Sequence, residues 1–65
     1  MKRSQARESI EAATNAALDR LFSKLFSMVF LDDPAAAPNF ASGLAALDRA
    51  YAVAMAEADK AFPEE

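Results

Sequence analysis

Apolar residues recur every three or four positions along most of this chain, a spacing that predicts two amphipathic α-helices. The first pattern continues without glycine or proline to Leu31. Asp32-Asp33-Pro34 then ends it, because proline disfavours helical geometry in the residue before it. We therefore predict an all-α fold, a two-helix antiparallel hairpin that forms a single domain over residues 1–65. Helix one is expected at about 4–31, a connector at 32–39 and helix two at about 40–62.

Polar residues that favour helix starts stand near both predicted boundaries. Ser4 is the expected N-cap of helix one and Asn39 that of helix two. Within the connector, Asp33 and Pro34 suit the N-cap and first position of a short capped turn, which Pro38 is expected to end. The connector should therefore be structured.

Helix two has one narrow apolar stripe with spacings of four and three, and charged residues and alanines lie outside it. Its members are Phe40, Leu44, Leu47, Tyr51, Ala54 or Met55, Ala58 and Phe62. The opposite side of helix two should face water.

Helix one is apolar over a much wider arc. Its expected stripe consists of Leu18, Phe22, Leu25, Phe26 and Val29, with Leu21 and Met28 on one flank and Phe30 on the other. A helix that faces solvent on one side needs an apolar face of only about 100°. Helix two, whose Ala50 and Ala46 are expected opposite Leu21 and Leu25, cannot cover this arc alone. The simplest remedy is a homodimeric four-helix bundle, and a larger protein partner is the other.

We predict a non-enzymatic protein–protein interaction module, self-assembling or adaptor-like, that uses the wide apolar face of helix one. The expected core or interface residues are Leu21, Phe22, Leu25, Phe26, Met28, Val29, Leu44, Leu47, Tyr51 and Met55. Asn15 has two interpretations, either a polar residue near the helix seam that sets alignment or an exposed residue near a fraying end.

A five-residue word occurs twice, at Ala16–Arg20 and at Ala45–Arg49, in a chain with seventeen alanines. The repeat indicates two related helices folded against each other, and chance is the alternative in so alanine-rich a sequence. Both copies contain Asp-Arg. Adjacent residues on a helix do not face each other, so we interpret these pairs as outward charges.

Composition argues against catalysis. The chain has no cysteine and no histidine, so disulfides, thiolate sites and the commonest metal ligand are excluded. No catalytic, cofactor-binding or metal-binding residues are expected, and the protein is predicted not to be an enzyme. Asp32 and Asp33 are interpreted as cap and turn residues because a calcium or magnesium site needs more oxygen ligands. Ser23, Lys24 and Ser27 form, with Arg20, a polar wedge on helix one.

The net charge is −3, with five basic and three acidic residues in 1–31 but two basic and seven acidic residues in 32–65. A dimeric hairpin that binds RNA or DNA is one alternative function, which the sequence pI near 4.7 disfavours. Its basic patch would consist of Lys2, Arg3, Arg7, Arg20 and Lys24. Another is attachment of helix one to a membrane surface through Leu21-Phe22 and Leu25-Phe26. No apolar run is long enough to span a bilayer and no secretory signal is evident, so the cytoplasm is the expected location.

Overall fold

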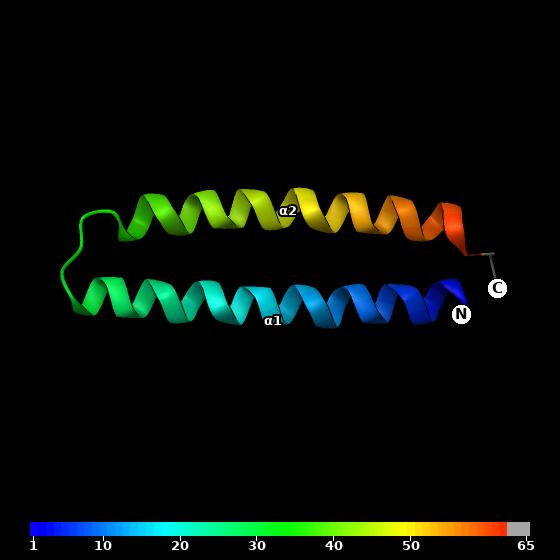
Figure 1. Cartoon of the computed structure of the whole chain (residues 1–65), viewed down its shortest axis with the longest axis horizontal. Coiled ribbons are helices and arrows are strands. Elements are labelled where there is room, and N and C mark those ends of the chain that lie inside the picture. Colours follow the sequence, from blue (N-terminus) through cyan, green and yellow to red (C-terminus); the bar gives the residue numbers. More distant parts are fainter. Residues whose placement is uncertain (63–65) are drawn as a thin grey trace.

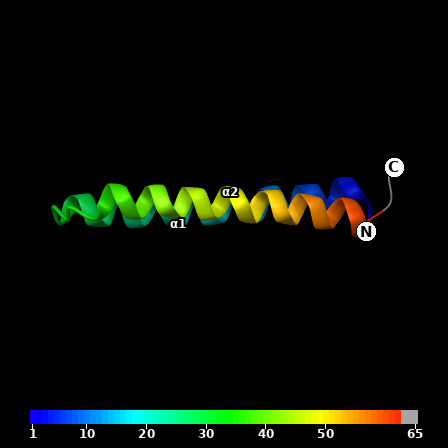
Figure 2. The same cartoon turned by 90° about the horizontal axis from the view of Figure 1, so that it is seen from above.

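The computed structural model describes residues 1–62 and contains two α-helices, α1 (Arg3–Phe30) and α2 (Ala36–Ala61). They run side by side in opposite directions and are joined by a turn at one end (Figure 1). The view from above places α2 over α1 along its whole length (Figure 2). No strand occurs among residues 1–62, so the predicted all-α hairpin is confirmed.

The first helix begins one residue before the predicted start. Lys2 occupies the N-cap position, and its backbone N–H donates to Gln5 Oε1 at 2.9 Å. The backbone N–H of Ala6 donates to Lys2 O at 3.0 Å. Ser4 lies inside the helix, so its prediction as N-cap was wrong. Gln5, three residues after Lys2, satisfies the backbone group that starts the helix, as such residues do in capping boxes.

The end of α1 has the hydrogen bonds of a Schellman motif. The N–H of Asp33 donates to Met28 O, and the N–H of Asp32 donates to Val29 O, both at 2.9 Å. Asp32 adopts the left-handed conformation, with φ of 57°. Aspartate tolerates this conformation better than most residues with a side chain, although glycine adopts it at less cost.

The connector is shorter than predicted because α2 begins at Ala36. Asp33 is the expected cap of this turn, and its Oδ1 accepts a hydrogen bond from the Ala35 N–H at 2.9 Å. Pro38 does not end the turn: it lies in the first turn of the helix, where N–H groups have no helical partner. Asn39 continues the helix, its N–H bonded to Ala35 O at 3.0 Å. The predicted connector over 32–39 and the Asn39 cap were therefore wrong.

Contact between the helices follows one line of buried and half-buried residues on each. On α1 these are Arg3, Ala6, Ile10, Thr14, Ala17, Leu18, Leu21, Leu25 and Met28. On α2 they are Ala36, Phe40, Gly43, Leu47, Tyr51, Ala54, Met55 and Ala58, with Phe62 just beyond the helix. The three residues classed as fully buried are all alanines, so the hairpin encloses no large side chain.

The register between the helices differs from the expected one. Leu21 packs against Gly43, where an added Cβ would overlap Leu21 Cδ2. The expected neighbour of Leu21, Ala50, lies instead beside Ala13 and Ala17 along one groove. The shift follows from the short connector, which centres the turn near Asp33.

The hairpin is a rod of 49 × 15 × 10 Å with a radius of gyration of 15.1 Å. A compact chain of this length would have a radius of gyration of about 11 Å. Its accessible surface is 4830 Å², against about 4,000 Å² for a compact protein of its mass. A single hairpin therefore leaves much of its apolar surface in water.

Candidate functional site

Exposed large apolar residues concentrate near the turn. We call residues 21–44 the turn half, and residues 1–20 with 45–62 the open half. Six of the eight exposed large apolar residues belong to the turn half: Phe22, Phe26, Val29, Phe30, Leu31 and Leu44. The same half carries only three charged residues, Lys24, Asp32 and Asp33. Apolar exposure and low charge therefore coincide.

Four of these residues form one continuous surface on α1. Phe22, Phe26, Val29 and Phe30 are 43%, 72%, 58% and 89% exposed. They are spaced by three or four residues, which places them along one side of the helix. Phe26 and Phe30 also line a shallow depression with Leu31. We name these four residues the phenylalanine surface.

The phenylalanine surface faces outward because α1 is rotated relative to the predicted stripe. Leu21 and Met28, expected on a flank, face α2 together with Leu25. Phe26 and Val29, expected in the stripe, are exposed. The predicted stripe on helix one was therefore wrong in this part, and the glycine at position 43 explains the choice, since it leaves room for Leu21.

One edge of the phenylalanine surface is held by α2. The rings of Phe22 and Phe40 lie 5.1 Å apart between centroids, tilted by 40°, a favourable aromatic arrangement. Further along, Leu18 and Leu44 line one groove with Leu47 and Tyr51. The surface is therefore carried by a rigid helix.

The ten predicted interface residues fall into two groups. Half-buried ones lie along the contact between the helices: Leu21, Leu25, Met28, Leu47, Tyr51 and Met55. Exposed ones are Phe22, Phe26, Val29 and Leu44. The prediction omitted Phe30, the most exposed of all, and Leu31. The four-residue spacing from Phe26 to Phe30 was a signal that could have found Phe30.

Toward the open half, the side of α1 that carries the phenylalanine surface becomes acidic and polar. Steps of three or four residues back from Phe22 reach Asp19, Asn15, Glu11 and Glu8, all exposed. Asn15 does not lie in the contact between the helices, so its interpretation as a seam residue was wrong. One side of α1 is thus acidic over one half and aromatic over the other.

The open end is closed by polar contacts between the helices. Arg3 Nη2 donates to Asp59 O at 2.8 Å and to Phe62 O at 3.3 Å, which caps the end of α2. Arg3 and Arg7 both form ion pairs with Asp59, at 3.5 and 3.0 Å. A cation at this end also opposes the helix dipole favourably.

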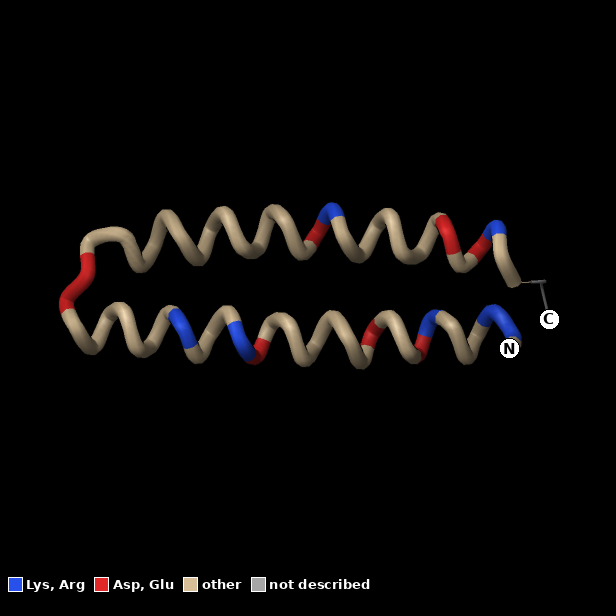
Figure 3. Tube along the Cα trace, viewed as in Figure 1, with Lys and Arg blue, Asp and Glu red and all other residues tan. Residues whose placement is uncertain are grey.

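Charged residues are spread along the open half and the middle of the rod, with Asp32 and Asp33 at the turn (Figure 3). The five cations of the nucleic-acid alternative do not gather in one patch. Arg3 and Arg7 pair with Asp59, and Lys24 lies about 30 Å from Arg3 along α1, at 1.5 Å per residue.

A groove with small side chains follows the contact between the helices in the open half. Ala13, Ala17, Ala50 and Ala54 line it. Its only polar side chains are Thr14 and Tyr51, and the Thr14 hydroxyl donates to Ile10 O at 2.7 Å. Nowhere in residues 1–62 do three acidic side chains gather as a metal site would require. Neither described helix has the length and apolar character needed to cross a membrane.

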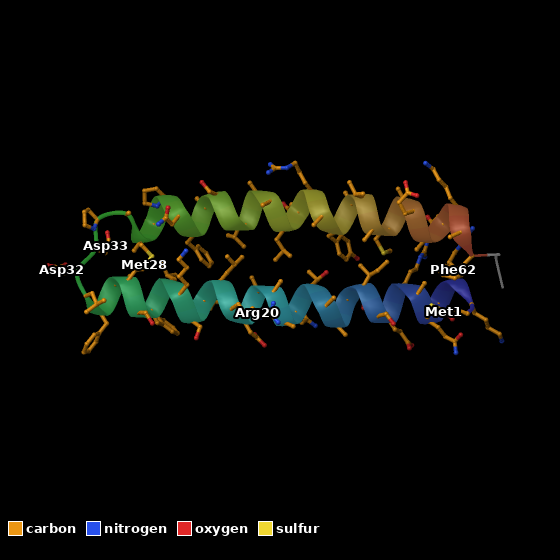
Figure 4. All side chains as sticks on the ribbon, viewed as in Figure 1. Met1, Arg20, Met28, Asp32, Asp33 and Phe62 are labelled. Atoms are coloured by element: carbon orange, nitrogen blue, oxygen red, sulfur yellow. The ribbon has the colours of Figure 1, made fainter. Side chains whose placement is uncertain are left out.

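Side chains of the whole hairpin are drawn in Figure 4, with Asp32 and Asp33 at the turn and Met1 and Phe62 at the open end. Comparisons of the chain with protein-family models, with curated proteins and with solved structures found no significant match. The function is therefore argued from the phenylalanine surface itself.

Proposed function

We propose that this chain is a non-enzymatic protein–protein interaction module that binds another helical surface through its phenylalanine surface. The observation that carries the proposal is the outward position of Phe26 and Phe30 on a rigid helix, 72% and 89% exposed. Contiguous exposed apolar patches of this kind mark interaction sites in small proteins.

The area involved is large for so small a protein. Phe22, Phe26 and Phe30 together expose about two whole phenylalanine side chains, roughly 300–500 Å². At about 25 cal/mol per Å², covering this area in two copies contributes roughly 15–25 kcal/mol, against an association cost of about 4–15 kcal/mol. Association therefore has the driving force to be stable.

The simplest form of this module is a homodimeric four-helix bundle, because two-fold symmetry lets one surface cover an identical one. An adaptor that docks a larger protein would use the same residues. The cytoplasm stays a prediction from the sequence.

The test is sedimentation equilibrium of the purified chain and two matched variants. Phe26→Ser removes a central residue of the phenylalanine surface, and Val53→Ser removes an apolar residue of α2 that is 62% exposed in the open half. We expect Phe26→Ser to raise the dimer dissociation constant about a hundredfold. Val53→Ser should change it less than about twofold, since an isolated exposed apolar residue contributes little.

Far-ultraviolet circular dichroism of both variants checks that the helices persist. A wild-type chain that is monomeric at every concentration, or equal weakening by both variants, would overturn the proposed self-assembly through this surface.

A further inference from the structure

We infer that two copies pack antiparallel with Phe26 beside the two-fold axis, so that only their turn halves overlap and their open halves project as two-helix arms. This inference rests on the proposed function and adds the partner's identity and placement. The partner is a second copy of this chain.

The surface area supports a second copy as the occupant. The hairpin exposes about 800 Å² more than a compact protein of its mass. One partner's share of a standard protein–protein interface is also about 800 Å². A symmetric pair of hairpins would therefore bring this chain to an ordinary exposed surface.

The change along one side of α1 excludes two of the three possible alignments. A parallel pair would set Glu8, Glu11 and Asp19 beside their own copies, which like-charge repulsion disfavours. Two fully overlapping antiparallel copies would set the phenylalanine surface against this acidic segment, burying carboxylates without partners.

The half-overlapped antiparallel pair avoids both conflicts. With Phe26 at the axis, residues whose numbers sum to 52 lie at the same level, because α1 rises evenly by 1.5 Å per residue. Phe22 of one copy then lies level with Phe30 of the other, and the acidic segments stay in water. Aromatic pairs contribute beyond their buried area.

The ends of the overlap agree in charge. Each turn carries Asp32 and Asp33, and in this alignment Asp32 lies level with Arg20 of the second copy. The segment from Asp19 to Lys24 carries two cations and one anion. A parallel pair would instead hold the two acidic turns together. Charge complementarity of this kind fixes the register of an interface.

Pulsed electron–electron spin resonance on singly labelled dimers tests this alignment, and the chain suits it because it has no native cysteine. Ser9→Cys labels the open half and Ser23→Cys the turn half, both at exposed serines. From the helix rise, we expect about 50 Å between the two labels at position 9 and less than about 20 Å between those at position 23.

Separations of about 20 Å or less at both positions would overturn the inference, because parallel pairs and fully overlapping antiparallel pairs each give that result. Dimers with these separations would still leave the interaction through the phenylalanine surface standing. Absence of any intermolecular distance at all concentrations would overturn the dimer itself.

A charge exchange gives a second readout that does not depend on labels. Arg20→Glu should weaken the dimer severalfold, and adding Asp32→Arg in the same chain should restore most of the loss. A parallel pair would show no such restoration, because residues 20 and 32 would not meet. Lack of restoration would contradict the alignment.

Discussion

The two halves of this hairpin solve the same packing problem with different residues. In the open half, alanines at positions 6, 54 and 58 let the helices approach, and the Arg3–Asp59 contacts close the end. In the turn half, large side chains such as Leu21 pack against Gly43 and the phenylalanine surface remains outside. The comparison teaches that the open half is complete as a pair of helices, whereas the turn half is built for more than two.

Truncation of a large side chain in each half gives the largest expected contrast. Leu21→Ala should lower the free energy of unfolding by about 2–3 kcal/mol, because it empties a site enclosed by Gly43 and its neighbours. Ile10→Ala should cost only about 1 kcal/mol, since Ile10 lines open grooves that water can fill. Urea unfolding at one fixed protein concentration measures both. Equal losses would contradict the contrast between the halves.

Filling the glycine site sharpens the same comparison. Gly43→Ala should lower the free energy of unfolding by about 1 kcal/mol, because the clash with Leu21 exceeds the gain in helix propensity. In the Leu21→Ala background the same change should become stabilising, and a double-mutant cycle in urea measures this coupling. Ser42→Ala, at an exposed neighbouring position, is the control. Stabilisation by Gly43→Ala alone would show that the close approach is not required.

A change at the turn should stabilise the hairpin by about 1 kcal/mol. Asp32→Gly relieves the left-handed conformation at φ of 57° and removes a carboxylate from the end of α1. Asp33→Gly is the contrasting variant, and it should destabilise because it removes the cap on the Ala35 N–H. Thermal unfolding at constant concentration measures both. A loss of stability in Asp32→Gly would contradict the Schellman assignment.

The smallest effect is expected at the open end. Arg3→Ala should cost about 0.5–1 kcal/mol, since two carbonyl contacts and one partly exposed ion pair are lost. Lys2→Ala, a neighbouring exposed cation, should change stability less. Urea unfolding at low and high salt checks the electrostatic share of this loss. Identical effects of the two substitutions would contradict the capping role of Arg3.

The helices themselves were predictable, because Asp32-Asp33-Pro34 interrupts two long periodic patterns. The start of α2 was not, since Pro38 usually indicates a boundary yet is tolerated where helix N–H groups have no partner. Local sequence rules gave Asn39 and Pro38 equal standing as boundary residues. Only the Asp33 cap decides that the helix starts earlier.

The rotation of α1 was also beyond the periodicity. Between residues 21 and 30, nearly every direction around α1 is apolar, so a line through Phe22 and Phe26 looked as suitable as one through Leu21 and Leu25. The choice depends on Gly43, which belongs to the other helix and leaves room for Leu21. Phe30 was missed as a surface residue for the same reason: a wide apolar arc does not reveal which of its members will face out.

Absolute mass by light scattering during size-exclusion chromatography, over a hundredfold range of concentration and at two salt levels, tests most directly whether the turn half is completed by another copy. We predict twice the chain mass of 7.0 kDa across the upper part of the range, with no dissociation at high salt because the contact is apolar. A single-chain mass at every concentration, or dissociation caused by salt, would contradict the proposed pairing of phenylalanine surfaces.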